Sequence, residues 1–315
     1  MSDTPLTPAI AQATRKRGLR AGGPGRKRTQ GNWRGLPFVL PYLPLLIVFG
    51  VLPMIYAITL AFTSTKGKFV GLSNFNKAGG DFRFGDAFAH VFVYTAVWLV
   101  ALMIFVVGLA LMLHSRASKA TATFRFLYYM PGALAGAASV LVWLFMLDPA
   151  VSPARLLLEH VFGVHLFVEA IAPGHLPYIF AMIAFWTGAG GWIVVLYGAL
   201  NTIPSDLEEA ARIDGAGAWT IALRLKLPMI RKWVAYMVIL SFATGTQLFV
   251  EPQLVNEASL GHVPDTWSAN QLAYQLAFRY ARFNEAAAIS VDLLVIGLIA
   301  AVLIVTRTGL FKKDD

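Results

Sequence analysis

Eight charged side chains gather in one short stretch of this 315-residue sequence, which reads EEAARIDGAGAWTIALRLKLPMIRK from Glu208 to Lys232. Carboxylates lie beside the small residues Ala210 and Ala211, where another protein can approach closely and form ion pairs. The sequence has no phosphate-binding loop of the form GxxxxGK[ST], and its six histidines are scattered. These residue types do not indicate a reaction. On their own they favour a solvated loop that merely joins two membrane helices, and recognition of a partner is the alternative.

Local signals in this stretch predict two helices joined by a sharp turn. Ser205 stands three residues before Glu208, which is the spacing of a capping box. Gly215 can adopt a positive φ and end the first helix, and a second helical run then bends at Pro228. If Ser205 and Glu208 cap each other, the carboxylate of Glu209 stays available to a partner.

The composition indicates that a membrane surrounds most of the chain. Hydrophobic residues make up 57% of it, charged residues 14%, and the mean hydropathy is +0.63, which is too apolar for a soluble domain of this length. A helical crossing needs about 20 apolar residues. Six segments reach that length: Leu36–Phe62, His90–Leu113, Phe124–Leu147, Leu176–Leu200, Trp233–Gln253 and Glu285–Thr306. We therefore predict an all-α polytopic membrane protein built as a six-transmembrane-helix bundle.

Prolines and glycines predict how these helices are shaped and packed. The first segment contains four prolines: Pro37, Pro41, Pro44 and Pro53. We expect it to be kinked or partly irregular, with neighbours covering the freed carbonyl groups. Gly132 and Gly136 have GxxxG spacing, and Gly188–Gly191 reads GAGG. Both sites allow close approach of two backbones, either within this chain or between chains.

The positive charges divide unevenly between the two sides of the expected membrane. If the N-terminus is cytoplasmic, 19 of the 26 Lys and Arg residues lie on the cytoplasmic side, so the positive-inside rule places both termini there. The net charge of +9 therefore indicates orientation, or attraction to anionic membrane lipid, and not nucleic acid. We expect a disordered basic tail over residues 1–35, a membrane domain over 36–306 with a cytoplasmic loop at 201–232, and a cytoplasmic tail over 307–315.

Three connections on the opposite side are too long to be simple turns. They cover residues 63–89, 148–175 and 254–284. Loops of this length usually have a function or are disordered. In the first two we expect short helices or hairpins, which contact something outside the membrane.

Polar and aromatic residues at membrane depth are candidates for a substrate pathway. Gln247 and Glu251 are four residues apart, hence on one face of a helix, and Asp292 lies in the last segment. Ionisable groups inside a membrane are rare and usually face a cavity. Trp143 and Trp186 are the aromatic candidates. Each residue has a second interpretation: Glu251 at the headgroup level, Asp292 paired with another helix, and the tryptophans at membrane interfaces.

The charged stretch resembles the EAA loop of membrane subunits of binding-protein-dependent ABC importers. That motif has Glu-Ala-Ala, three residues, Gly, nine residues and then Ile-x-Leu-Pro. This chain has Glu209, Ala210, Ala211, Gly215 and Leu225–Pro228 at that spacing, with Leu in place of Ile. Its IDGA and LP elements are similar to the sugar-importer branch. Further similarity covers FVGLSNF at 69–75, FRFLYYMP at 124–131 and ALNTIP at 199–204.

The resemblance implies a cytoplasmic coupling helix that docks in a cleft of a separate ATPase chain. Glu209 would offer its charge to an Arg or Lys of that partner, Ala210 and Ala211 would permit contact, and Gly215 would supply the turn. The residues implied in coupling are Glu209, Ala210, Ala211, Ile213, Gly215, Leu225, Leu227 and Pro228.

The same resemblance implies the function and the partners. The chain would form half of the translocation pathway for a sugar or oligosaccharide in a prokaryotic plasma membrane, with no cofactor, no metal and no enzymatic activity of its own. Its partners would be a second permease subunit, cytoplasmic ATP-binding subunits and an extracytoplasmic solute-binding protein. Residues 248–261 depart from the Thr-Gly-Gly-Gly-Pro run of many relatives, which leaves the sugar unspecified. A stand-alone carrier or channel for a small polar solute, and a membrane-embedded transferase, are the alternatives.

Overall fold

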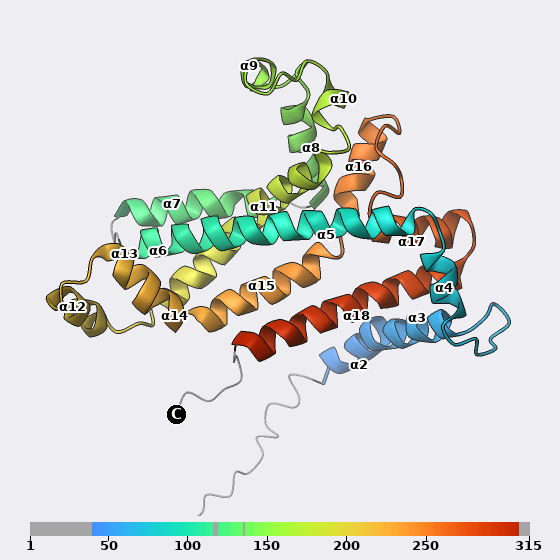
Figure 1. Cartoon of the computed structure of the whole chain (residues 1–315), viewed down its shortest axis with the longest axis horizontal. Helices are drawn as coiled ribbons and strands as arrows, with labels where there is room; N and C mark the ends of the chain where they lie inside the picture. The colour runs from blue at the N-terminus through green and yellow to red at the C-terminus, as the bar shows by residue number, and fades with distance from the viewer. Residues whose placement is uncertain (1–39, 116–118, 135, 309–315) are drawn as a thin grey trace, which may run out of the picture. The chain divides into compact units, whose positions relative to one another are not determined.

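A computed structural model of the chain describes residues 40–115, 119–134 and 136–308, which form helices joined by turns and loops (Figure 1). Within these ranges the extended backbone pairs at a single bridge, between Thr63 and Phe69, so the all-α class is confirmed. The chain divides into two compact units, residues 1–53 and 54–315. The predicted tail at 1–35 lies outside the described residues, as does most of the tail at 307–315.

The proline-rich first segment is irregular, as predicted. It contains α2 (Tyr42–Leu46), the π-helical stretch η2 (Ile47–Val51) and α3 (Leu52–Phe62). Pro44 lies in α2 and Pro53 in α3. Proline has no backbone N–H and therefore interrupts α-helical hydrogen bonding, and a π-helical turn between the two prolines accommodates this loss.

The second unit holds the other helices, of which η4 is a 3₁₀ helix and η3, η5 and η6 are π-helical. Its first half contains α4 (Ser73–Gly79), α5 (Phe84–Ala101), η3 (Leu102–Val106), α6 (Val107–Ser115), α7 (Lys119–Tyr129), η4 (Met130–Ala133), α8 (Gly136–Leu147), α9 (Arg155–His160), α10 (Phe167–Ala170) and α11 (Leu176–Leu200). Its second half contains α12 (Ser205–Ile213), α13 (Ala218–Thr220), η5 (Ile221–Lys226), α14 (Leu227–Met229), α15 (Arg231–Gly245), α16 (Val250–Ala258), α17 (Ala269–Tyr274), η6 (Gln275–Arg279) and α18 (Phe283–Thr308).

Four helices are long and apolar enough to cross a membrane: Tyr42–Phe62, Phe84–His114, Leu176–Leu200 and Phe283–Arg307. Two further candidates are bent pairs: Phe126–Ala133 with Gly136–Leu147, at 105°, and Arg231–Gly245 with Val250–Ala258, at 44°. Counting each pair as one span gives the six that the sequence predicts. Two of the six are therefore broken rather than continuous, and each break lies near a proline, Pro131 or Pro252, that cannot donate a backbone hydrogen bond.

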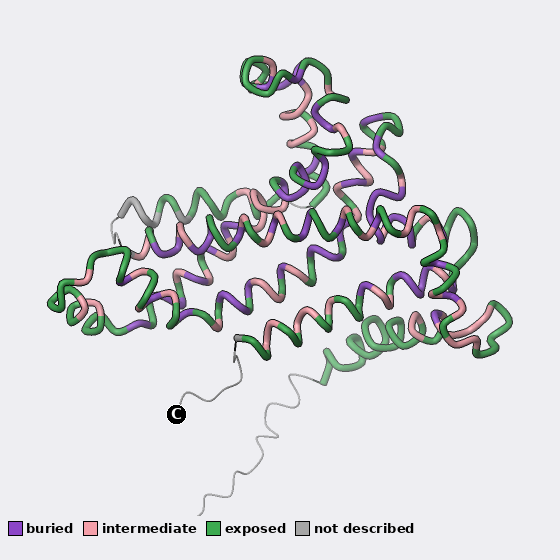
Figure 2. Tube along the Cα trace, viewed as in Figure 1, coloured by how far each residue is buried: buried purple, intermediate pink, exposed green. Residues whose placement is uncertain are grey.

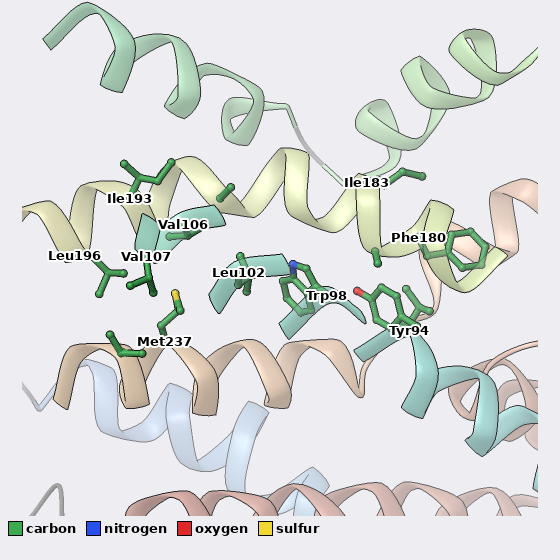
Figure 3. Packing of buried hydrophobic residues seen from close by; sticks show 14 of the residues in the cluster. Tyr94, Trp98, Leu102, Val106, Val107, Phe180, Ile183, Ile193, Leu196 and Met237 are labelled. Atoms are coloured by element: carbon green, nitrogen blue, oxygen red, sulfur yellow. The ribbon is translucent and has the colours of Figure 1, made fainter. Parts of the chain in front are cut away.

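The core of the second unit forms where the continuous helix α5–η3–α6 packs against α11 and α15. Figure 3 shows Leu102 and Val106 of this helix between Ile193 of α11 and Met237 of α15, and all four side chains are fully buried. Lipid is as apolar as these side chains, so close packing rather than exclusion from water holds such helices together.

Glycines bring α7–η4, the first arm of the bent pair at 105°, against α11. A Cβ atom added to Gly190 would overlap the backbone of Tyr128, and one added to Gly132 would lie 2.8 Å from the carbonyl oxygen of Thr187. At both positions the helices touch through backbone atoms. The packing of small residues within this chain, one of the two interpretations of these glycines, is thus confirmed for Gly132 and Gly190.

Two asparagines hold the C-terminal end of α3. The side-chain amide of Asn74 donates to the carbonyl oxygens of Ala61 (2.9 Å) and Thr63 (2.8 Å). The amide of Asn284, at the start of α18, donates to Leu60 (3.0 Å) and to the same Thr63 oxygen (2.7 Å). These bonds satisfy carbonyl groups that the end of a helix leaves without intrahelical partners.

The expected short helices in the long connections are confirmed. Residues 63–89 contain the bridged turn and α4, and residues 148–175 contain α9 and α10. Glu169 fixes the start of α10, because its carboxylate accepts hydrogen bonds from the backbone N–H of His165 (2.7 Å) and Leu166 (3.1 Å). These two donors lower the pKa of Glu169, since they stabilise its charged form.

Candidate functional site

The first half of the charged stretch is a short helix that ends in a tight glycine turn. Gly215 has φ +83°, a conformation that glycine adopts without steric cost. The N–H of Gly215 donates to the carbonyl of Arg212 (3.0 Å), and the N–H of Ala216 donates to that of Ala211 (2.9 Å). This pair of bonds is the Schellman ending of a helix, and the predicted helix, glycine turn and second helix are confirmed.

The predicted capping box at the start of α12 is wrong. The N-cap residue is Pro204, and the Ser205 hydroxyl lies 3.4 Å from Asp206 Oδ1 instead of capping the helix. Glu208 turns away from the helix start and forms an ion pair with Lys226, Nζ to Oε1 2.9 Å. A hydrogen bond between two charged groups is about twice as strong as one between neutral groups. This explains why Glu208 pairs with the Lys226 ammonium and not with a backbone N–H at the start of the helix.

Lys226 joins Glu208 to the end of a membrane helix. Its Nζ also lies 2.9 Å from Nδ1 of His114, the last but one residue of α6. Lysine can only donate, so His114 Nδ1 is the acceptor in this contact. Arg212 Nη2 approaches the other Glu208 oxygen at 3.8 Å. This group of residues is called the Glu208–Lys226–His114 cluster below.

The other face of α12 carries no such contacts and is exposed (Figure 2). Glu209 and Ala210 are exposed and Ala211 is half-buried. Ile213 is 86% exposed and Trp219, just after the turn, is 76% exposed. The tip of the hairpin therefore exposes a carboxylate and two large apolar side chains, on a segment that also contains the small residues Ala210 and Ala211.

The remaining candidate coupling residues lie at the base of the hairpin. Leu227 packs against the main hydrophobic core, and Leu225 is half-buried. Pro228 is exposed and occupies the start of α14. The structure thus separates the eight residues into an exposed tip and a base that is anchored to the bundle.

Sequence reasoning gave no role to Lys226, His114 or Trp219. A signal for Lys226 was present, since it interrupts an apolar run, IALRLKLP, and a lysine there is buried at high cost unless it is paired. The position of His114 gave no such signal, because it is 112 residues away from Lys226 in the sequence.

Gln247 and Glu251 do not share one helix face as predicted. Gln247 is exposed in the turn between α15 and α16, and Glu251 is half-buried in the first turn of α16. The 44° bend between these helices separates the two side chains. Asp292 is half-buried within α18.

The two tryptophan candidates pack against each other. Their rings lie at 90° with centroids 5.8 Å apart, Trp143 from α8 and Trp186 from α11. Trp186 also lines a hollow of about 400 Å³ together with Phe124, Tyr128 and Pro131. This part of the predicted pathway is therefore mainly aromatic and lies on the α7–α8 side of the bundle.

Two hollows share polar residues from α17 and α18. Asn270 and Ser290 line both a hollow of about 390 Å³, which Gln247 also lines, and one of about 440 Å³. Four aromatic rings that follow one another in space line the second hollow. The distances between ring centroids are 5.4 Å from Phe249 to Tyr274, 4.9 Å from Tyr274 to Phe278, and 6.2 Å from Phe278 to Phe283. Amide and hydroxyl groups thus stand beside a row of aromatic faces.

A bundle of membrane-crossing helices from which an exposed helical hairpin projects defines a polytopic membrane protein. The sequence matches a protein family described as "Binding-protein-dependent transport system inner membrane component" over residues 108–310, and the chain belongs to this family. It is thus an inner-membrane component.

Relatives of the chain are named as permeases. It is 26% identical over 297 residues to a probable ABC transporter permease of Bacillus subtilis, covering 90% of this chain and 93% of the relative. It is 26% identical to a probable starch degradation products permease of Thermoanaerobacterium thermosulfurigenes, covering 90% and 96%. It is 27% identical to the maltose/maltodextrin permease of Salmonella typhimurium, covering 78% of this chain and half of that protein.

A solved structure has the same fold. It is a bacterial ABC transporter involved in the import of the acidic polysaccharide alginate, with a TM-score of 0.72 and 20% identity, over 89% of this chain and 96% of that one.

Proposed function

We propose that this chain is a membrane subunit of an ATP-driven importer and that α12 couples it to a separate cytoplasmic ATPase. The observation that carries this proposal is the exposed tip of the hairpin, where Glu209 and Ile213 face away from the bundle on a helix that buries none of its residues. Membership of the binding-protein-dependent family supports it. ATP would be hydrolysed on the partner chain, and a solute-binding protein would deliver the substrate.

The chemistry of the tip fits a cleft that is apolar at its base and basic at its rim. Ile213 and Trp219 would fill the apolar part, since large side chains at the centre of an interface contribute most of the binding energy. Glu209 would pair with an Arg or Lys, and the small side chains of Ala210 and Ala211 would let the two backbones come close. A second permease subunit would complete the translocation pathway.

We assign a sugar or oligosaccharide as the substrate. The relatives named for maltodextrin and starch products support this class, as does the alginate importer of the same fold. In this chain, the hollows shared by Asn270 and Ser290 combine hydrogen-bonding groups with the aromatic faces of Phe249, Tyr274 and Phe278, the combination that a ring with many hydroxyl groups requires. A relative named for the uptake of osmoprotective compounds makes a small osmolyte the second candidate.

Reconstitution tests this proposal. The chain is purified in mild detergent with its co-purifying subunits and placed in vesicles with ATP on the hairpin side and labelled maltodextrin or a small osmolyte on the other. We expect accumulation against a gradient that requires both the solute-binding protein and ATP. Solute movement by the chain alone, without nucleotide, would instead identify a stand-alone carrier.

A further inference from the structure

Lys226 is buried without a role in the docking surface. Among the residues whose burial the structure describes, it is the one Lys, Arg, Asp or Glu residue that is buried, with 3% of its side chain exposed. Burying an ammonium group is unfavourable unless charged and hydrogen-bonding partners replace water. The contacts that the Lys226 ammonium makes are therefore expected to have a role in the protein.

Those contacts connect three separate elements. The Lys226 ammonium, in η5, lies 2.9 Å from the Glu208 carboxylate of α12 and 2.9 Å from the His114 ring of α6. Glu208 Oε1 and His114 Nδ1 are themselves 3.8 Å apart, so the three groups form a compact triangle. Only the lysine in this triangle can donate to both of its neighbours, so without its ammonium group the two hydrogen bonds that join α12 to α6 through the triangle are lost.

The two elements that Lys226 joins differ in how firmly they are held. Helix α12 buries none of its residues, so apolar packing fixes its position weakly. Helix α6 is the end of the continuous helix Phe84–Ser115, which packs against α11 and α15 in the main core. The Glu208–Lys226–His114 cluster thus links the loosely packed hairpin to the central helix of the bundle.

We propose that Lys226 is a positioning residue that makes α12 and α6 move together, an inference that rests on the docking function proposed above. A displacement imposed on α12 by the ATPase is passed by Glu208 to Lys226 and from there to His114. Because α5–η3–α6 runs through the core, its displacement reaches α11 and α15. Without the ammonium group, α12 can shift on its glycine turn while the membrane helices stay in place.

A measurement of the distance between α12 and α6 tests this link directly. The chain has no cysteine, so spin labels can be placed at Asp214→Cys, after α12, and Met112→Cys, on an exposed position of α6. In the assembled complex we expect a narrow distance distribution for the wild type and one at least about twofold broader for Lys226→Met. Arg224→Met is the matched control, because it removes one exposed positive charge from the same π-helical stretch and should leave the distribution narrow.

The coupling of ATP hydrolysis to import gives a second measurement, which would not change if Lys226 only stabilised the fold. For Lys226→Met we expect the ATPase to remain bound and to hydrolyse ATP. The number of substrate molecules imported per ATP should fall about tenfold. The variant Lys226→Arg keeps the charge and should retain most of the coupling.

A double variant controls for the possibility that Lys226→Met simply fails to fold. Lys226→Met leaves Glu208 without its strongest partner, whereas Glu208→Gln with Lys226→Met removes both charges and spares the chain an unpaired buried group. The double variant should insert normally and still be uncoupled. Narrow distances and wild-type import per ATP in either variant would overturn the positioning role. If the wild-type chain itself binds no ATPase, the proposed function fails first.

Discussion

Substitution of the single residue Glu209 tests the proposed docking surface. Because its side chain is exposed and lies outside the Glu208–Lys226–His114 cluster, Glu209→Lys should leave insertion and abundance unchanged. In the complex, a buried pair that loses one member costs about 3–5 kcal/mol, against under about 1 kcal/mol for an exposed pair. We expect ATPase pull-down to be strongly reduced and substrate-stimulated hydrolysis to be lost.

Asp206→Lys is the matched control for Glu209. It reverses an exposed acidic residue in the first turn of the same helix, so it changes the net charge equally. Equal loss of pull-down in both variants would mean that α12 responds to charge in general. Wild-type pull-down for Glu209→Lys would make the hairpin a simple connector.

Gln247 and Asp292 test the substrate pathway. Gln247 lines the hollow that contains Asn270, whereas Asp292 is not among the residues that line it. We expect Gln247→Ala and Asn270→Ala to raise the substrate concentration needed for half-maximal uptake without loss of assembly. Asp292→Asn should impair uptake if the carboxylate faces the pathway. Unchanged transport in all three variants would assign these residues to packing.

The sequence predicted the backbone of the hairpin better than its side chains. Gly215 follows from the rule that a helix commonly ends at a glycine with positive φ, a purely local requirement. Glu208 had two possible partners, a nearby backbone N–H and a lysine 18 positions further on. Spacing along the chain favours the first, and only the folded hairpin brings the second within reach. Local rules therefore failed where a distant charge was the stronger partner.

The approach of α7–η4 to α11 makes a prediction at the scale of the element. Gly190→Val places a side chain against the backbone of Tyr128, so the two elements must separate. Overpacking of this kind typically costs about 1–3 kcal/mol, and we expect a lower unfolding temperature in detergent. Gly191→Val is the control, since a Cβ atom at Gly191 meets nothing within 4 Å. Equal shifts for the two variants would trace the effect to helix propensity alone.

Hydropathy predicted where the membrane segments lie but not how they bend. The third and fifth segments contain enough apolar residues for one crossing each, yet the structure breaks both. Pro131 and Pro252 gave a local signal for these breaks, as Pro44 and Pro53 did for the first helix. The close contacts of Gly132 and Gly190 between η4, α7 and α11 join segments that are far apart in the sequence, so no single segment encodes them.

The distribution of charge makes a prediction for the whole molecule. Because 19 of 26 Lys and Arg residues lie on one side of the predicted topology, both termini and the α12 hairpin should be cytoplasmic. A cysteine at Ala216 should resist an impermeant thiol reagent added to intact cells, whereas one at exposed Lys68 should react. Labelling at Ala216 in intact cells would reverse the orientation.

The two asparagines at the end of α3 have a consequence for biosynthesis. A nascent chain is made from its N-terminus, so Asn74 can reach the carbonyl of Thr63 soon after α3 has entered the membrane. Asn284, which shares that oxygen, follows Thr63 by 221 residues and is translated much later. Until then the Leu60 carbonyl accepts the backbone N–H of Thr63 but lacks the side-chain amide of Asn284. The C-terminal end of α3 is therefore completed only after the start of α18 has been synthesised, so the maturation of the first membrane helix has to wait for α18.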